Sequence, residues 1–197
     1  MDKEKVGELK SFSNYYIMVV ILEEALGGIM IMWKHSLFLG TFLNANKHFM
    51  VVNIKSIALN KEWYIVNVYA PNIKNSTKIL WNTLSNIKSN DYYGRWIFLG
   101  NFNVPLYEHE KKGVNVSQLD GRLDFLDFIN REGLMDLDIL GIDFTWSNKR
   151  VGNDYIQALL DRVLISLDWT KDFLCNLRAI QKIGLNHFPL IFRVEAI

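Results

Sequence analysis

The stretch Trp96–Asn103 constrains the fold of this chain more than any other. Its sequence, Trp-Ile-Phe-Leu-Gly-Asn-Phe-Asn, is an apolar run that ends at a glycine, with two amides following at alternate positions. The run predicts a short buried strand, and the glycine permits a sharp turn at its end. Because side chains two apart in extended chain point the same way, Asn101 and Asn103 are expected at one spot on a sheet edge, where α/β proteins place ligand sites. An asparagine-rich turn after a strand is the alternative interpretation.

Length and charge limit the classes of protein that fit. The chain has 197 residues, of which 50% are hydrophobic, and this suits one domain with a core or a large piece of a bigger one. Lys and Arg number 22 against 21 Asp and Glu, so bulk charge does not indicate a nucleic-acid binder. The single cysteine, Cys175, excludes an internal disulfide and a cysteine metal cluster, and fits a reducing compartment.

The apolar stretch near the start bears on localisation. Tyr15–Leu22 is too short to cross a bilayer, and Glu23 and Glu24 follow it directly. It also lacks a convincing small-residue cleavage site for a signal peptidase. We therefore expect an intracellular monomer, nuclear or cytoplasmic, that is neither secreted nor embedded in a membrane.

Strand and helix patterns are mixed along the chain. Two segments have helical spacing: one after Asn75 or Ser76, with Ile79, Leu80, Thr83, Leu84 and Ile87 on one face, and one that opens at Asp120 or Gly121. A third, shorter helix is predicted over Asp168–Leu174. Apolar or alternating runs predict strands over Tyr15–Leu22, Ile29–Trp33, Phe49–Ile57, Glu62–Val68, Trp96–Leu99, Ala158–Ser166, Ala179–Ile183 and Leu190–Val194. The mixture predicts an α/β sandwich, with two sheets face to face and helices outside.

Five short motifs occur in a fixed order. They are Asn-Val-Tyr-Ala-Pro, Leu-Gly-Asn-Phe-Asn, Phe-Thr-Trp, Leu-Asp-Arg-Val-Leu-Ile-Ser and Asn-His-Phe-Pro-Leu. In this order they resemble the endonuclease/exonuclease/phosphatase superfamily, which has the deoxyribonuclease-I-like fold, and most of all the endonuclease domains of plant LINE-type retrotransposons. The resemblance implies a four-layered α/β sandwich with two packed mixed sheets, truncated at its N-terminus. It also implies a divergent segment over 1–26 and an endonuclease/exonuclease/phosphatase-like domain over 27–197.

The resemblance implies metal-assisted hydrolysis of a phosphodiester. In the family a divalent ion, usually magnesium, polarises the phosphate, and a carboxylate in the Gly-Asp-Phe-Asn motif prepares the attacking water. An aspartate in the Leu-Asp-Arg strand orients a histidine that contacts the phosphate, so Asp161 is expected to hold the ring of His187. Carried over position by position, the catalytic set is Tyr69, Asn101, Asn103, Asp161 and His187, and the substrate-binding residues are Trp146 and Asn186.

This chain departs from the family pattern at two acids. Asn101 stands where the family has the aspartate of Gly-Asp-Phe-Asn, and Asn186 stands where it has the aspartate of Ser-Asp-His. An amide cannot take a proton from water at neutral pH, and it carries no charge for a metal ion. Because the loss of a general base lowers a rate by about 10²–10⁴-fold, we expect little activity from this site.

The implied metal ligand falls in the divergent start of the chain. The family carries its main ligand in a Gln-Glu-Thr motif at the end of its second strand, and Ile21–Ala25 is interpreted as a decayed form of it, with Glu24 as the ligand. A solvated turn that begins at Glu23 and Glu24 is the alternative. No first strand bearing the family's asparagine is visible, so binding of Mg²⁺ is doubtful here.

Three functions remain open from the sequence. The first is a degenerate nuclease-fold domain, derived from a retrotransposon, with weak or no catalysis. The second is an active magnesium-dependent DNA endonuclease in which Glu24 and the amides still hold a metal through water. The third is a non-catalytic domain that binds nucleic acid or protein through the old cleft. Taken one at a time, Tyr69, Asp161 and His187 also fit ordinary structural roles; their order favours the family site.

Overall fold

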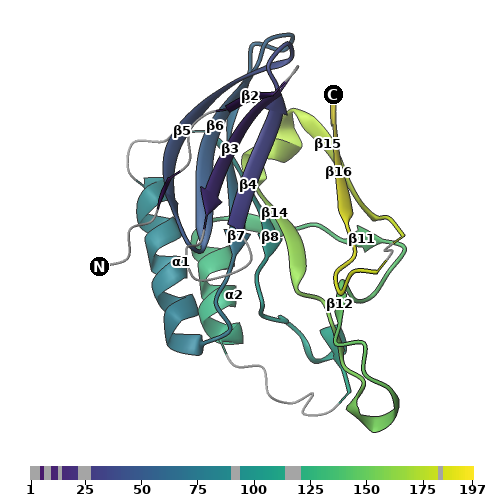
Figure 1. Cartoon of the computed structure of the whole chain (residues 1–197). Helices are drawn as coiled ribbons and strands as arrows, with labels where there is room; N and C mark the ends of the chain where they lie inside the picture. Colours follow the sequence, from purple (N-terminus) through teal and green to yellow (C-terminus); the bar gives the residue numbers. More distant parts are fainter. Residues whose placement is uncertain are drawn as a thin grey trace.

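The computed structural model describes residues 5–6, 10–12, 15–21, 28–89, 94–113, 121–181 and 184–197, with side chains from residue 28 onward. A six-stranded sheet forms the centre of the molecule (Figure 1). Strands β7 and β8 run parallel, and the other neighbours pair antiparallel. In sheet order the strands are β10 (Leu134–Asp136), β14 (Asp161–Ser166), β8 (Arg95–Asn101), β7 (Glu62–Tyr69), β6 (Phe49–Ser56) and β5 (Phe38–Asn46).

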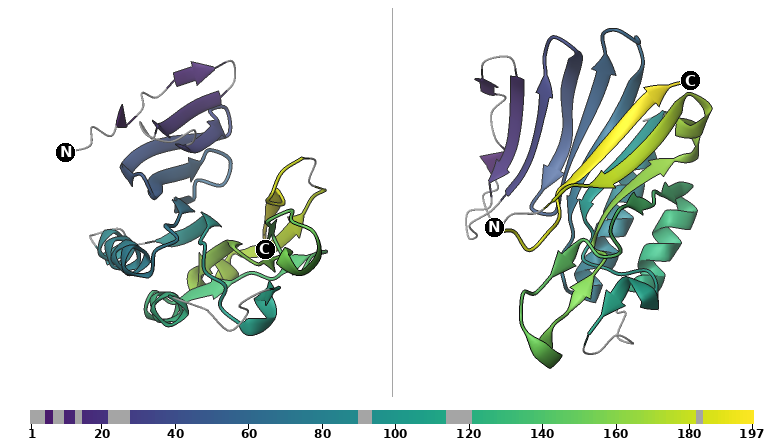
Figure 2. Two further views of the ribbon diagram at one scale, coloured as in Figure 1. Left: turned by 60° about the horizontal axis from the view of Figure 1, so that its bottom comes forward. Right: turned by 90° about the vertical axis from the view of Figure 1, so that its right-hand side faces the viewer.

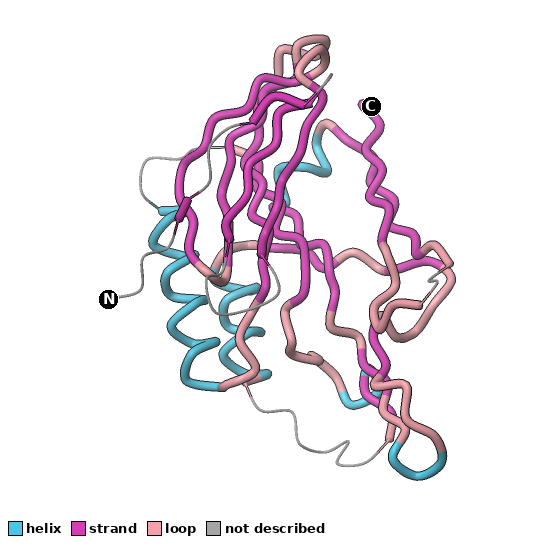
Figure 3. The backbone as a smooth tube through the Cα atoms, viewed as in Figure 1, coloured by secondary structure: helices cyan, strands magenta, loops and turns pink. Residues whose placement is uncertain are grey.

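Two α-helices cover one face of this central sheet. Helices α1 (Lys74–Ser89) and α2 (Arg122–Arg131) lie side by side along the strands (Figure 3). The ring of Trp81 in α1 stacks on that of Phe125 in α2, with 4.8 Å between their centroids. Both rings are fully buried beside Val66 and Phe98 from the sheet. Burial of large aromatic side chains on both sides of this interface is what fixes the helices to the sheet.

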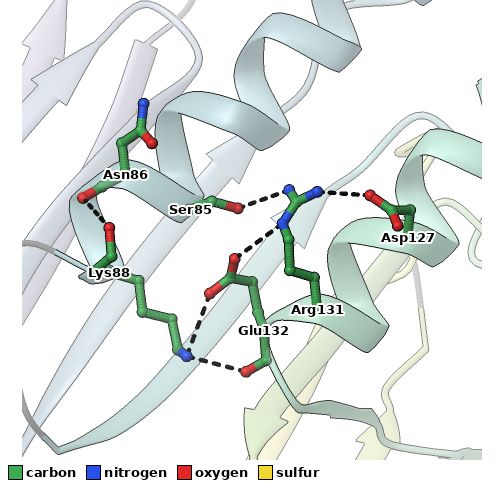
Figure 4. A network of polar contacts seen from close by, with 7 residues as sticks. Ser85, Asn86, Lys88, Asp127, Arg131 and Glu132 are labelled. Carbon is green, nitrogen blue, oxygen red and sulfur yellow. Dashed lines mark hydrogen bonds and ion pairs between the residues drawn. The ribbon is translucent and has the colours of Figure 1, made fainter.

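Polar contacts join the two helices at their C-terminal ends (Figure 4). The guanidinium of Arg131 donates to Ser85 Oγ at 2.9 Å and to Asp127 Oδ2 at 2.6 Å. Lys88 Nζ donates to the backbone carbonyl of Glu132 at 3.0 Å, just after α2 ends. A positive charge in the last turn of a helix also interacts favourably with the partial negative charge at the helix C-terminus. These contacts link the outer surfaces of α1 and α2.

The opposite face of the central sheet is covered by strands in two separate groups (Figure 2). One group contains β3 (Tyr15–Ile21) and β4 (Gly28–Lys34), with the short strands β1 (Lys5–Val6) and β2 (Lys10–Phe12). The other group is the antiparallel pair β15 (Phe173–Ala179) and β16 (Leu190–Ala196), extended by β11 (Ile139–Leu140). The predicted α/β sandwich of packed sheets is therefore confirmed.

Each group of covering strands has its own apolar core. Ile29 and Trp33 of β4 pack over a buried cluster on β6, formed by Met50, Val52 and Ile54. Leu177 and Phe192, from β15 and β16, pack with Ile97, Val163 and Ile165 of β8 and β14. Trp63 and Ile65 of β7 touch both clusters, so β7 runs beneath the boundary between the two groups.

A fourth, small sheet lies near the end of the central strands. It contains β9 (Lys111–Lys112), β12 (Trp146–Ser147) and β13 (Gln157–Ala158). Three 3₁₀-helices complete the described elements: η1 (Glu108–Glu110), η2 (Gly152–Asp154) and η3 (Leu167–Lys171). In this small sheet Trp146, the last residue of the Phe-Thr-Trp motif, pairs with Ala158 of β13. Thr145 of the same motif accepts a hydrogen bond from the first residue of β14.

Several predicted elements are corrected by the structure. Of the short helix expected over Asp168–Leu174, only the part up to Lys171 is helical, as the 3₁₀-helix η3. Strand β15 covers Phe173–Ala179, so the strand expected over Ala179–Ile183 is wrong except at Ala179; residues 182–183 lie outside the described residues. Strand β5 was not predicted. The strand expected over Ala158–Ser166 is divided into β13 and β14. The other predicted strands from Ile29 onward are present with shifts of one or two residues.

The N-terminal strands also bear on the expected division of the chain. Strand β3, within residues 1–26, pairs along its whole length with β4 of the following segment, from Tyr15↔Lys34 to Ile21↔Gly28. The boundary between residues 26 and 27 stays a prediction. Within the described ranges, no helix is both long and apolar enough to span a bilayer.

Candidate functional site

Three of the predicted site residues form one row at an edge of the central sheet. Tyr69 is the last residue of β7, Asn101 is the last of β8 and Asp161 is the first of β14. Asn101 is in register with both Tyr69 and Asp161. Because β7 and β8 are parallel and β14 is antiparallel to β8, these ends meet at one edge, and residues in register present their side chains on one face.

The turn after β8 depends on a glycine and two amides. Gly100 has a φ of +125°, and a Cβ there would lie 2.2 Å from the carbonyl oxygen of Val68. Asn101 Oδ1 accepts a hydrogen bond from the backbone N–H of Asn103 at 2.8 Å, and Asn103 has a left-handed φ of 55°. Asn103 Nδ2 donates to the carbonyl of Ala70 at 2.5 Å. Both amides therefore hold the turn in place and tie the end of β8 to the end of β7.

His187 lies beside the row, on the loop that precedes β16. Its Nδ1 is 2.8 Å from Asp161 Oδ2, so the contact expected from the sequence is present. The carboxylate is more buried than the ring: the side chain of Asp161 is 16% exposed and that of His187 is 38% exposed. The hydrogen bond between the carboxylate and Nδ1 fixes the orientation of the ring. Nε2 is therefore the nitrogen that is left to contact a ligand.

Thr145 is a supporting residue that the sequence did not single out. It is fully buried, and its Oγ1 accepts the backbone N–H groups of Leu160 and Asp161, both at 2.9 Å. Its backbone carbonyl accepts the N–H of Phe188 at 2.8 Å. Thr145 therefore positions the two chain segments that carry Asp161 and His187. The signal that could have found it is its place in the Phe-Thr-Trp motif.

A buried charged cluster anchors β14 one residue beyond Asp161. The guanidinium of Arg162, which is 2% exposed, bonds the carboxylates of Glu110 and Asp136. Glu110 Oε2 also accepts the backbone N–H of Leu106 at 2.6 Å. Burial raises the pKa of the Asp136 carboxyl, and the charge of Arg162 opposes this shift. The cluster fixes the loop after β8 against β14.

The remaining predicted residues differ in how the structure places them. Trp146 forms an isolated antiparallel bridge with His187, and their ring centroids are 6.5 Å apart. The backbone carbonyl of Asn186 accepts the N–H of Ser147 at 3.1 Å, so Asn186 lies beside the same strand. Glu24 lies outside the described residues. The structure thus places Trp146 and Asn186 beside His187, which is the residue that contacts Asp161.

The side chains at this site do not fit a magnesium ion. No group of three or more His, Cys, Asp or Glu residues suited to a metal occurs in the described ranges. The row contains one carboxylate, Asp161, which is engaged by His187, and the side-chain oxygen of Asn101 is engaged by Asn103. Mg²⁺ requires hard oxygen ligands in octahedral geometry, with carboxylates among them. We therefore assign no chemical step to a metal at these residues.

Comparison with known proteins identifies the fold. The chain has the fold of the endonuclease/exonuclease/phosphatase proteins. It is similar to the endonuclease domain of TRAS1, a telomere-specific non-LTR retrotransposon, with a TM-score of 0.71 and 16% identity over 93% of this chain and 81% of that one. An endonuclease/exonuclease/phosphatase protein from Bacteroides vulgatus gives a TM-score of 0.66 and 13% identity over 93% and 77%.

A third solved structure of this fold contains nucleic acid. Zebrafish TDP2 complexed with a single-stranded DNA product matches with a TM-score of 0.54 and 16% identity, over 89% of this chain and 72% of that one. At these identities the similarity shows the fold alone. No protein-family model matches the chain, and no curated protein matches it in sequence.

Proposed function

We propose that this chain is a degenerate phosphodiesterase or endonuclease domain, derived from a retrotransposon, with weak or no catalysis. The observation that carries the proposal is the Asp161–His187 pair at the end of a sheet row whose middle member, Asn101, is an amide. The motif order supports a retrotransposon origin, and so does the similarity to the TRAS1 domain. Magnesium is then the ancestral cofactor.

The retained residues can bind a phosphate without activating water. His187, held by Asp161, can donate from Nε2 to a phosphate oxygen when its ring is protonated. Asn101 and Asn186 cannot accept a proton from water at neutral pH. Since the loss of a general base alone lowers a rate by about 10²–10⁴-fold, hydrolysis is expected to be slow.

DNA is the ligand that we propose for this site. The support is the nature of the similar proteins, one of which is a retrotransposon endonuclease and another of which was solved with single-stranded DNA. The formal net charge of +1 provides little general attraction to a polyanion. We therefore expect weak binding to DNA by a monomeric intracellular protein.

Two other functions are distinguishable from this one. An active magnesium-dependent endonuclease would need a ligand such as Glu24, and Asn101 would have to hold the metal through water. A non-catalytic binding domain would take up nucleic acid or protein with no hydrolysis even after the acids are restored. Each alternative therefore predicts a different outcome when the two amides are converted to aspartates.

The test compares the natural chain with Asn101→Asp/Asn186→Asp in a plasmid-nicking assay with Mg²⁺ or Mn²⁺, alongside calorimetric titration of each metal. We expect slow or undetectable nicking by the natural chain and measurable, chelator-sensitive nicking by the double variant. The triple variant that adds His187→Ala is the matched control and should lose the restored activity. Robust chelator-sensitive nicking by the natural chain would refute the proposal. A folded double variant that binds DNA but does not nick it would favour the binding domain.

A further inference from the structure

The loop that carries His187 pairs with β12 in a short antiparallel ladder. The backbone N–H of Phe188 donates to the carbonyl of Thr145 at 2.8 Å. The backbone N–H of Ser147 donates to the carbonyl of Asn186 at 3.1 Å. His187 lies between these two hydrogen bonds, so β12 holds the loop on both sides of the histidine.

Lys149 continues this ladder with its side chain. In an antiparallel ladder alternate residue pairs are hydrogen bonded, so Lys149 and Gly184 form the next such pair in the same register. Lys149 has a left-handed φ of 56°, which turns its backbone out of the strand direction. Its Nζ instead donates to the carbonyl of Gly184 at 2.6 Å. The ammonium therefore supplies a donor at the position where a backbone N–H would continue the ladder.

Asn148 shapes the turn in which Lys149 lies. Its Oδ1 accepts the backbone N–H groups of Arg150 at 3.2 Å and Ile156 at 3.1 Å, and its Nδ2 donates to the carbonyl of Asp154 at 2.7 Å. The hairpin between β12 and β13, which includes η2, projects at the bottom of Figure 3. Because three hydrogen bonds constrain its backbone, the direction of the Lys149 side chain is set within the hairpin.

The backbone of Lys149 is in a conformation that a side chain makes unfavourable. A left-handed φ is costly for a residue with a Cβ, and glycine removes the cost. Such strain persists where the surrounding structure requires it, and it is concentrated at functional sites. The hydrogen bond to the carbonyl of Gly184 is what the lysine provides and a glycine at the same position would not.

We propose that Lys149 is a positioning residue for His187. Its bond to Gly184 fixes the start of the loop shortly before the histidine, so that Nε2 of the ring is oriented toward a phosphate oxygen of DNA. The carboxylate of Asp161 fixes the other side of the same ring through Nδ1. The proposal rests on the function proposed above, in which His187 binds a phosphate. Lys149 has its effect through the loop rather than through a phosphate contact of its own.

A double-mutant cycle tests whether Lys149 acts through His187. The measurement is the affinity of the full chain for a short, fluorescently labelled single-stranded DNA, without metal, at about pH 6, where a histidine is largely protonated. Lys149→Met keeps the stem and removes the donor; it should weaken binding about three- to tenfold alone and less than about twofold in the presence of His187→Ala. Arg150→Met removes the same charge from the adjacent exposed residue and, as the control, should have the same effect with and without His187→Ala. Equal effects of Lys149→Met in both backgrounds would overturn the proposal.

A glycine variant separates positioning from support of the fold. Lys149→Gly relieves the left-handed backbone and removes the ammonium, so it should unfold at the same or a higher temperature while its affinity for the DNA falls about three- to tenfold. Lys149→Arg keeps a charged donor, and its affinity should stay within about twofold of that of the natural chain. If affinity and unfolding temperature fall together in Lys149→Gly, Lys149 only supports the fold and the proposal is wrong.

The position of His187 is also measured without DNA. In NMR spectra, Lys149→Met should shift the ring-proton resonances of His187, whereas Arg150→Met should leave them unchanged. If the natural chain binds no DNA, the proposed function fails, while shifted His187 resonances in Lys149→Met still support the positioning role. Unchanged resonances in Lys149→Met would overturn that role.

Discussion

The carboxylate of Asp161 lies 2.8 Å from Nδ1 of His187, although the two residues are 26 positions apart. Asp161 begins β14 in the central sheet, and His187 precedes β16 in the second layer. The contact therefore joins the two layers at the edge where Tyr69 and Asn101 also lie. Thr145 supports this contact, because it accepts hydrogen bonds from the backbone N–H of Asp161 and from that of Phe188, which follows His187.

The Asp161–His187 contact should contribute to stability as a coupled pair. In a double-mutant cycle with Asp161→Asn and His187→Gln, we expect a coupling free energy of about 0.5–2 kcal/mol at pH 6, measured by urea unfolding. The exposed pair Lys171–Asp168, at 2.6 Å, is the control and should show clearly weaker coupling, because solvent screens exposed charges. Equal coupling in the two pairs would mean that partial burial adds nothing at the site.

Removal of the Thr145 hydroxyl should destabilise the protein and disturb the site. Thr145→Val leaves the N–H groups of Leu160 and Asp161 buried without an acceptor, at a cost of about 1–3 kcal/mol in unfolding free energy. Thr145→Ser keeps the hydroxyl, so it should retain most of the unfolding free energy that Thr145→Val loses. Thr83→Val, at an exposed helix position, is the control and should change stability by less than about 0.5 kcal/mol. If both valine variants behave alike in urea unfolding, the proposed role of Thr145 is wrong.

A side chain at Gly100 should displace the turn that carries Asn101. Gly100→Ala places a Cβ 2.2 Å from the Val68 carbonyl at a φ of +125°, and we expect a loss of at least about 2 kcal/mol in unfolding free energy. Gly141→Ala also has a positive φ, +95°, but its Cβ would meet nothing within 4 Å. Gly141→Ala therefore measures the cost of backbone strain without a steric clash. If it loses as much unfolding free energy as Gly100→Ala does, the clash with the Val68 carbonyl is not the cause of the loss at Gly100.

The buried Asp136 should give the protein a distinctive pH dependence. Its pKa in the folded state is raised by burial above the ordinary value of an aspartate, so the folded state holds this proton more tightly than the unfolded state does. As pH rises from about 3.8 through the raised pKa, this group lowers the free energy of unfolding. The natural chain should therefore lose stability relative to Asp136→Asn between pH 4 and pH 7 in urea unfolding.

Asp168 provides the control of opposite sign for this measurement. A hydrogen bond and the charge of Lys171 lower the pKa of its carboxyl, so its contribution is present above about pH 3.8 and is lost as pH falls through the lowered pKa. Relative to Asp168→Asn, the natural chain should not lose stability between pH 4 and pH 7. The same trend for both residues would exclude burial as the cause of the Asp136 effect.

The sequence was most informative where a pattern is local. The apolar run before Gly100 identified β8, and helical spacing identified both α-helices. It assigned the buried face of α1 only in part: Leu80, Leu84 and Ile87 are buried as predicted, but Ile79 is 67% exposed and the buried Trp81 was missed. Periodicity fixes which residues share a face, but the packing partner decides which face is covered.

The order of five motifs by itself predicted the fold, which is confirmed, and it proposed Tyr69, Asn101, Asp161 and His187 as site residues. This was possible because the residues that end a strand and those that follow it are neighbours in the sequence. Only the tertiary structure decided the distances between these residues, the role of Thr145 and the Arg162 cluster. Each of these depends on the register of strands that are far apart in the chain, such as β8 with β14 and β15 with β16. Local residue preferences carry no information about that register, because it is set by which apolar faces pack together when the whole sandwich forms.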